Sequence, residues 1–142
     1  MKKTTEELMN EIQNSPNASL YFSENEDEMS DMSLSLYLQT LLEKYHLKRA
    51  NLFRKAGLVG SNYGYEIFHG TKNTPSRDIL IMICLAFPLT IEETQHVLRC
   101  GKLSILYPRD KRDAYVLYAL THKLELDTLN DLLTQNGLPI FN

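Results

Sequence analysis

The sequence of 142 residues contains two cysteines, no tryptophan and no long apolar run. Cys84 and Cys100 form no Cys-x-x-Cys pair, so they predict reduced thiols in the cytoplasm rather than a disulfide framework. The longest apolar stretch, residues 79–89, includes Pro88 and is shorter than the ~20 residues of a membrane span. The N-terminal lysines precede no apolar core of the kind that a signal peptide has. We therefore expect a cytoplasmic protein that makes no membrane contact.

Residues arranged for catalysis or for metal binding are also lacking. The sequence contains no nucleophile beside a base, no glycine-rich phosphate loop and no pair of catalytic carboxylates. His96 and Cys100 have the four-residue spacing of two metal ligands on one helix, but no second pair accompanies them. We therefore expect no enzyme activity, no catalytic residue, no metal and no cofactor.

Charge is distributed unevenly along a chain whose net charge is only −3. Residues 1–42 have two basic and eight acidic residues, residues 43–77 have seven and two, and residues 78–142 have six and eight. The three segments therefore carry −6, +5 and −2. The low overall charge argues against a strongly basic nucleic-acid binder, whereas the basic middle segment favours an anionic partner at that place. The alternative is an ordinary solvated helical surface.

Apolar residues recur at three- and four-residue intervals and strand patterns are almost absent, so the sequence predicts an all-α fold. The stripe of Leu34, Leu38, Leu41 and Tyr45 is the clearest example. Residues 15–33 are instead polar and acidic, which predicts a linker or a disordered arm. The expected helices are 5–14, 34–45, 48–56, 61–69, 75–87, 90–100, 109–122 and 127–136.

Residues typical of helix ends support these boundaries. Ser61 and Thr90 are expected N-caps, with Thr90 and Glu93 forming a capping box, and Pro75 fits the first position of its helix. The helix over 75–87 is apolar on nearly all sides, which predicts that it lies at the centre of the core. The glycines that suit the left-handed position after a helix are Gly57, Gly70 and Gly137.

Two short helices joined by a glycine-containing turn resemble the helix-turn-helix of the lambda-repressor-like family, also called the XRE or Cro family. The resemblance covers about residues 34–100 and is carried by Leu52, Ala56-Gly57, Ile67 and the turn 70–75 before an apolar helix. It implies a five-helix lambda-repressor-like DNA-binding domain with added C-terminal helices. The segments that resemble a narrower bacterial subgroup with two such helices are 63–70, 75–78, 92–94, 106–108 and 111–114.

The resemblance also implies which residues contact duplex DNA, because the second helix of the motif presents its N-terminal side chains to the major groove. An asparagine there can pair bidentately with adenine, and a carboxylate can accept from the cytosine amino group. Counted back from Gly70, the base-contact candidates are Ser61, Asn62, Tyr65 and Glu66. The phosphate-contact candidates are Lys48, Arg49, Lys72, Asn73 and Arg77.

Three features depart from this family pattern or oppose DNA binding. Gly57 and Gly70 are thirteen residues apart, one more than usual, and the extra residue lies within 58–60. Gly64 stands where the family has an apolar core residue, and a glycine inside a helix costs about 1 kcal/mol and leaves a gap. Glu66 would face a polyanion. These features favour an alternative, a protein-interaction module that keeps the fold and has weakened or lost DNA binding.

We therefore expect three segments. Residues 1–32 form an acidic arm with a short helix and a linker, residues 33–101 form the helix-turn-helix domain, and residues 102–142 pack on the same core or form a dimer contact. The leading function is a transcriptional regulator that binds double-stranded DNA as a homodimer, because one such module buries little surface and useful affinity requires two half-sites. In the alternative function the partner is another protein.

Overall fold

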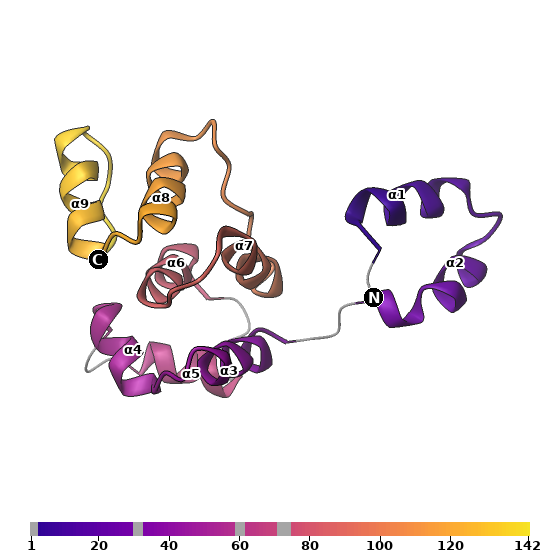
Figure 1. Cartoon of the computed structure of the whole chain (residues 1–142), viewed down its shortest axis with the longest axis horizontal. Helices are drawn as coiled ribbons and strands as arrows, with labels where there is room; N and C mark the ends of the chain where they lie inside the picture. Colours follow the sequence, from indigo (N-terminus) through magenta and orange to yellow (C-terminus); the bar gives the residue numbers. More distant parts are fainter. Residues whose placement is uncertain (1–2, 30–32, 59–61, 71–74) are drawn as a thin grey trace. The chain divides into compact units, whose positions relative to one another are not determined.

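The computed structural model describes residues 3–29, 33–58, 62–70 and 75–142, and the chain forms two compact units, Met1–Asp31 and Met32–Asn142 (Figure 1). Within the described ranges every element of regular secondary structure is a helix, so the all-α prediction is confirmed. None of the helices in these ranges has both the length and the apolar character needed to cross a membrane.

The N-terminal unit contains two helices, α1 (Thr5–Asn14) and α2 (Ala18–Glu24), followed by a 3₁₀ turn, η1 (Glu26–Glu28). Thr4 caps α1 by accepting a hydrogen bond from the Glu7 amide, and the Glu7 carboxylate accepts from the Thr4 amide in return. This capping box satisfies two backbone donors that a helix start would otherwise leave without partners.

Polar contacts around Asn25 join the parts of this unit. The Asn25 side chain is fully buried, accepts from the Lys3 ammonium at 2.7 Å, and donates to Glu11 at 3.1 Å and to the Tyr21 carbonyl at 3.0 Å. Tyr21 on α2 is buried as well. The prediction of a linker or disordered arm over 15–33 is therefore wrong for residues 18–28, because an acidic segment can order when buried partners satisfy its polar groups.

The second unit begins after the described residues of the first and contains a helical core formed around α6. Leu80, Ile81, Ile83 and Cys84 on α6 are fully buried, and α6 packs against α4, α7 and α9. The expectation that this segment lies at the centre of the core is confirmed. The helices of the unit are α3 (Leu34–Lys44), α4 (Arg49–Lys55), α5 (Tyr63–His69), α6 (Arg77–Ala86), α7 (Ile91–Cys100), α8 (Lys111–His122) and α9 (Leu126–Gln135).

The N-terminal turn of α7 attaches α3 to the rest of the unit. Thr90 and Glu93 form the predicted capping box, which is confirmed. Glu93 also accepts hydrogen bonds from the Tyr45 hydroxyl at 2.5 Å and from the Lys44 ammonium at 2.6 Å, both at the C-terminal end of α3. One carboxylate therefore caps its own helix and holds a neighbouring helix.

Two expected helix starts need correction. The N-cap residue of α5 is Asn62 rather than Ser61, which lies outside the described residues, and the Asn62 side chain makes no capping bond. Helix α6 starts after Ser76, whose side chain accepts from the Ile79 amide, so Pro75 is not its first residue. A serine hydroxyl satisfies an otherwise unpaired helix N–H, which favours Ser76 as the boundary. The predicted positive φ angles are confirmed at Gly57 (75°), Gly70 (80°) and Gly137 (69°).

Two reciprocal ion pairs join α6 to α8. Arg77 donates to both carboxylate oxygens of Asp113 at 3.0 and 2.9 Å, and Arg112 donates to both oxygens of Asp78 at 2.9 and 3.1 Å. The segments 77–78 on α6 and 112–113 on α8 therefore each supply one cation and one anion. Bidentate guanidinium–carboxylate pairs are among the stronger polar contacts in proteins because both hydrogen bonds are charge-assisted. These pairs attach the start of α8 to the start of α6.

Amide side chains hold the two irregular segments that flank the C-terminal helices. Gln95 donates to the Leu106 carbonyl at 3.0 Å and accepts from the Leu106 amide at 2.8 Å. Asn130 pairs with the backbone of Phe141 in the same way, at 2.8 Å in both directions. The Arg112 guanidinium lies 3.8 Å from the centre of the buried Phe141 ring. The C-terminal residues are therefore part of the core packing.

Candidate nucleic-acid interface

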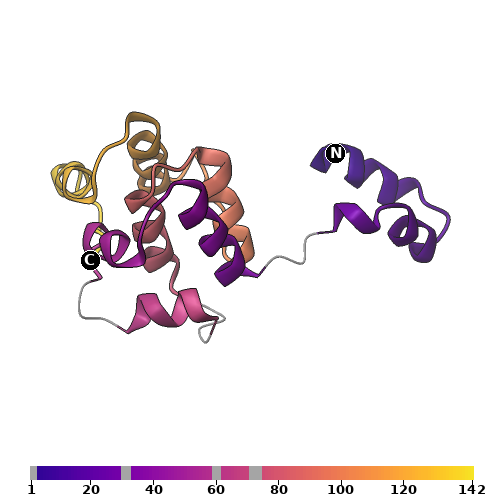
Figure 2. The ribbon, with the colours of Figure 1, turned by 60° about the horizontal axis from the view of Figure 1, so that its bottom comes forward.

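Helix α5 has one buried and one exposed face. Gly64, Ile67 and Phe68 are buried, whereas Asn62, Tyr65, Glu66 and His69 are exposed. The exposed residues have the i, i+3, i+4, i+7 spacing that places side chains on one side of a helix. Figure 2 shows α5 at the edge of the C-terminal unit. Three of the four base-contact candidates, Asn62, Tyr65 and Glu66, therefore share a single solvent-facing surface; the fourth, Ser61, lies outside the described residues.

The buried face of α5 closes on the aromatic ring of Phe53 from α4. A Cβ atom added at Gly64 would lie 2.8 Å from one ring carbon and 3.1 Å from two others. The Phe53 ring also makes edge-on contacts with the rings of Tyr65 (4.7 Å between centroids) and Phe68 (5.5 Å). The gap that a glycine leaves in a helix is thus filled by Phe53, so the departure at Gly64 is matched by a larger side chain on the facing helix.

Both ends of α5 are also attached to neighbouring helices. The Tyr63 hydroxyl accepts a hydrogen bond from the Ser76 amide at the start of α6. At the other end, Gln39 of α3 donates to the Phe68 carbonyl at 3.0 Å. These contacts fix the direction of α5 as well as its rotation, so the exposed face is held in a defined orientation.

Arg49, at the first position of α4, lies beside this exposed face. Its guanidinium is 3.2 Å from the His69 imidazole Nε2 and 5.8 Å from the centre of the Tyr65 ring. The Tyr65 and His69 rings are nearly parallel, with 6.4 Å between their centroids. A guanidinium has five N–H donors, and the hydrogen bond with His69 leaves most of those of Arg49 available for an anion. Lys48, the preceding residue, is exposed.

The remaining phosphate-contact candidates have different outcomes. Lys72 and Asn73 lie outside the described residues. Arg77 is removed from the candidate interface, because its guanidinium donates to Asp113 and also to the carbonyl oxygens of Ser104 at 3.0 Å and Ile105 at 3.1 Å. Every nitrogen of that guanidinium therefore donates inside the fold, and four of its five N–H donors are engaged there.

The structure adds His69 to the candidate surface, a residue that was not among the candidates from the sequence. His69 is exposed in the last turn of α5 and contacts Arg49. The spacing of Asn62, Tyr65 and His69 could have identified it, since a residue seven positions after Asn62 returns to the same face. We name the surface formed by Lys48, Arg49, Asn62, Tyr65, Glu66 and His69 the α5 surface.

The α5 surface contains hydrogen-bond donors and acceptors, two cationic side chains and an aromatic ring, a combination that can bind a polyanion and base edges. In the described part of the chain, no group of three or more histidine, cysteine or acidic side chains is arranged to hold a metal ion. Comparisons of the chain with known protein families, with curated proteins and with solved structures gave no match.

Proposed function

We propose that the C-terminal unit is a sequence-specific regulator that binds double-stranded DNA as a homodimer, and that α3–α7 form its lambda-repressor-like core. The observation that carries this proposal is the exposed face of α5, where Asn62, Tyr65 and Glu66 lie together next to Arg49. A helix presented in this way fits the major groove, while the start of the preceding helix meets the phosphate backbone.

Each residue of the α5 surface has a distinct role in this proposal. Asn62 pairs with an adenine, Glu66 accepts from a cytosine amino group, and Tyr65 packs beside them. Lys48 and Arg49 contact phosphates, and so do Lys72 and Asn73, which follow α5 in the sequence. The His69 imidazole positions the Arg49 guanidinium, since the two groups are 3.2 Å apart.

The C-terminal helices provide a surface for the proposed dimer contact. An open apolar hollow of about 440 Å³ lies between α8 and α9, and Tyr118 at its edge is 51% exposed. Exposed aromatic side chains around an apolar hollow are typical of protein interfaces. Binding to two half-sites requires the two α5 helices of such a dimer to lie about 34 Å apart. The hollow is lined by Ala114, Tyr115, Tyr118, Leu124 and Leu132.

Selection of bound sequences from random duplex DNA tests the proposal. We expect recovery of a palindrome, because a two-fold symmetric dimer binds two inverted half-sites. A salt titration on that palindrome measures the phosphate contacts. With the three cations Lys48, Arg49 and Lys72 on each subunit, the slope of log K against log salt should be about −5 for the dimer.

Variants separate the roles of phosphate and base contacts. Arg49→Ala should weaken binding to all sequences and make the slope less steep by about 2 units per dimer. Asn62→Ala should cost about 1–3 kcal/mol on the selected site and relax the preference at one base pair. Arg99→Ala, an exposed change at the end of α7, is the matched control and should have no effect. Binding without salt dependence, or equal binding by Arg49→Ala, argues against DNA recognition.

The apolar surface of α8 and α9 also favours a second candidate function, a protein-interaction module that has weakened or lost DNA binding. Tyr118→Ser distinguishes the two functions. In the DNA-binding proposal this change weakens self-association and lowers DNA affinity at low protein concentration. In the second function the wild-type protein is already monomeric in sedimentation experiments, so there is no self-association for Tyr118→Ser to weaken. The selection from random duplex DNA then recovers no sequence.

A further inference from the structure

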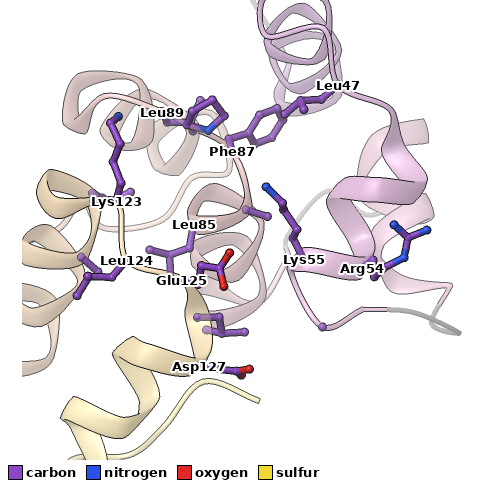
Figure 3. Close-up of a pocket in the computed structure, with 16 residues that line it drawn as sticks. Leu47, Arg54, Lys55, Leu85, Phe87, Leu89, Lys123, Leu124, Glu125 and Asp127 are labelled. Atoms are coloured by element: carbon purple, nitrogen blue, oxygen red, sulfur yellow. The ribbon is translucent and has the colours of Figure 1, made fainter.

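A half-open groove of about 580 Å³ separates α4 from the turn between α8 and α9 (Figure 3). Helices α4 and α9 both pack against α6, which lies beneath the groove. Side chains of Leu85, Phe87, Leu124 and Leu126 contribute an apolar lining. A volume of this size falls within the range of about 300–1,000 Å³ that is common for small-molecule sites.

Two oppositely charged side chains reach into the groove from facing walls. Lys55 extends from the end of α4, and Glu125 extends from the start of α9 (Figure 3). Neither makes an ion pair with another described residue, and Glu125 does not cap its own helix. Arg54 also lines the groove but turns away from it and donates to Asn51 at 3.0 Å. Lys123 and Asp127 line the groove as well, but in Figure 3 the Lys123 ammonium points away from its centre and Asp127 lies at its lower edge. Lys55 and Glu125 are therefore the oppositely charged pair that extends over the apolar lining.

We propose that this groove binds a small zwitterion with an apolar side chain, an apolar α-amino acid either free or as a dipeptide. The carboxylate of the ligand binds the Lys55 ammonium, its ammonium group binds Glu125, and its side chain covers Leu85 and Leu124. A ligand with only one charge would pair with either Lys55 or Glu125. The other charged side chain would then lie next to the apolar part of the ligand without a partner. Charge complementarity therefore favours the zwitterion over an anionic lipid or a simple cation.

The groove also suggests how such a ligand regulates the protein, and this step rests on the proposed DNA-binding function. Lys55 belongs to α4, the helix that contributes Arg49 and Phe53 to the α5 surface and its support. A ligand that links α4 to α9 holds α4 in place and should strengthen DNA binding. Binding of DNA should in turn strengthen ligand binding by the same factor, because coupling between two sites is reciprocal.

The site is tested without DNA, by NMR titration of the full chain with four compounds. L-leucine and L-leucyl-L-leucine have both charges, N-acetyl-L-leucine lacks the ammonium group, and L-leucinamide lacks the carboxylate. We expect saturable shifts at groove residues such as Gly57 and Leu85, and an affinity for a zwitterion about fivefold above that for either blocked compound. The tighter of leucine and the dipeptide identifies the source of the ligand.

Two charge-removing variants assign the contacts. In Lys55→Gln, leucine should bind no better than leucinamide, and in Glu125→Gln it should bind no better than N-acetyl-leucine. Lys111→Gln and Asp131→Asn are matched controls on exposed parts of α8 and α9 outside the groove and should keep the full preference. The proposal is overturned if neither zwitterion gives saturable shifts in the groove, or if blocked and unblocked compounds bind equally to the wild type.

The ligand titration and the DNA-binding experiments test different parts of the proposal, so a negative result in one can be distinguished from a negative result in the other. Absence of ligand binding in a chain that recovers a palindrome overturns the groove site and leaves the proposed function intact. Absence of DNA binding in a chain that binds the zwitterion overturns the proposed function and the regulatory step, and leaves the ligand site intact. A DNA affinity that is unchanged by saturating ligand overturns the regulatory step alone.

Discussion

Replacement of Arg77 by lysine tests whether this residue supports the fold or binds DNA. Arg77→Lys keeps the positive charge, so a phosphate contact would largely survive it. Inside the fold, however, the guanidinium makes four hydrogen bonds, to two oxygens of Asp113 and to the carbonyls of Ser104 and Ile105. A lysine ammonium has three N–H donors on one nitrogen and cannot reproduce this planar arrangement. We therefore expect a loss of stability with no loss of DNA affinity.

The expected magnitude follows from the number of bonds lost and from their exposure. Hydrogen bonds to charged groups contribute about 1.5–3 kcal/mol each when shielded from water. The side chains of Arg77 and Asp113 are 26% and 10% exposed, so solvent screening reduces these values. With about half of the bonds retained by lysine, we expect a loss of about 2 kcal/mol. Arg77→Ala should cost about 3 kcal/mol, because it leaves a buried carboxylate without a cation.

Urea denaturation of the full chain measures the stability, and DNA binding is then measured at a temperature where the variant remains folded. Arg99→Lys, at an exposed position of α7, is the control and should change stability by less than about 0.5 kcal/mol. Unchanged stability of Arg77→Lys together with a severalfold loss of DNA affinity in Arg77→Ala would refute the reasoning, since it would mean that the guanidinium is available to a phosphate.

Two further substitutions and one labelling experiment test other contacts of the fold. Gly64→Ala should destabilise the protein by about 1 kcal/mol in equilibrium denaturation, because the new methyl group would lie 2.8 Å from the Phe53 ring. A more stable variant, as the helix propensity of alanine alone predicts, contradicts this packing. Burial opposes ionisation of Glu93, but hydrogen bonds from Lys44 and neighbouring donors outweigh it and hold its pKa below the ordinary 4.5. The stability gained from the Glu93 carboxylate is therefore present at neutral pH and is lost as the pH falls below 4.5. Glu93→Gln should flatten the dependence of Tm on pH in that range. An unchanged profile would show that this carboxylate does not cause the acid-dependent loss of stability. Burial raises the pKa of Cys84, so a thiol reagent should label it only in denaturant, and rapid labelling of the native protein would show that it is accessible.

The features that could be predicted from the sequence are those with local causes. The stripe of Leu34, Leu38 and Leu41 identifies the buried face of α3, because a helix returns to the same side every three or four residues. The Thr90–Glu93 capping box identifies the start of α7, because its two hydrogen bonds join residues three apart. In both cases the contact that fixes the element lies within about one turn, so the amino-acid pattern is sufficient there.

The role of Arg77 could not be predicted, because its partner is 36 residues away. A basic side chain at a helix start, next to a segment that resembles a DNA-binding motif, is locally indistinguishable from a phosphate contact. The folding of α2 could not be predicted for a similar reason. Asn17 caps this helix, but the buried partner that orders its end is Asn25, which receives a hydrogen bond from Lys3 at the opposite end of the unit.

The same long-range pairing changes the electrostatic argument for DNA binding. The sequence assigns +5 to residues 43–77, yet two of its seven cations are paired with acids from later in the chain, Lys44 with Glu93 and Arg77 with Asp113. The effective charge of the segment is therefore closer to +3. Since non-specific affinity for DNA depends on the number of phosphates neutralised, we expect a single subunit to bind random duplex weakly. In the proposed function, useful affinity must then come from the base contacts proposed for Asn62 and Glu66 and from the proposed second subunit. A sequence preference and a dependence on dimerisation are thus linked consequences of one small basic surface.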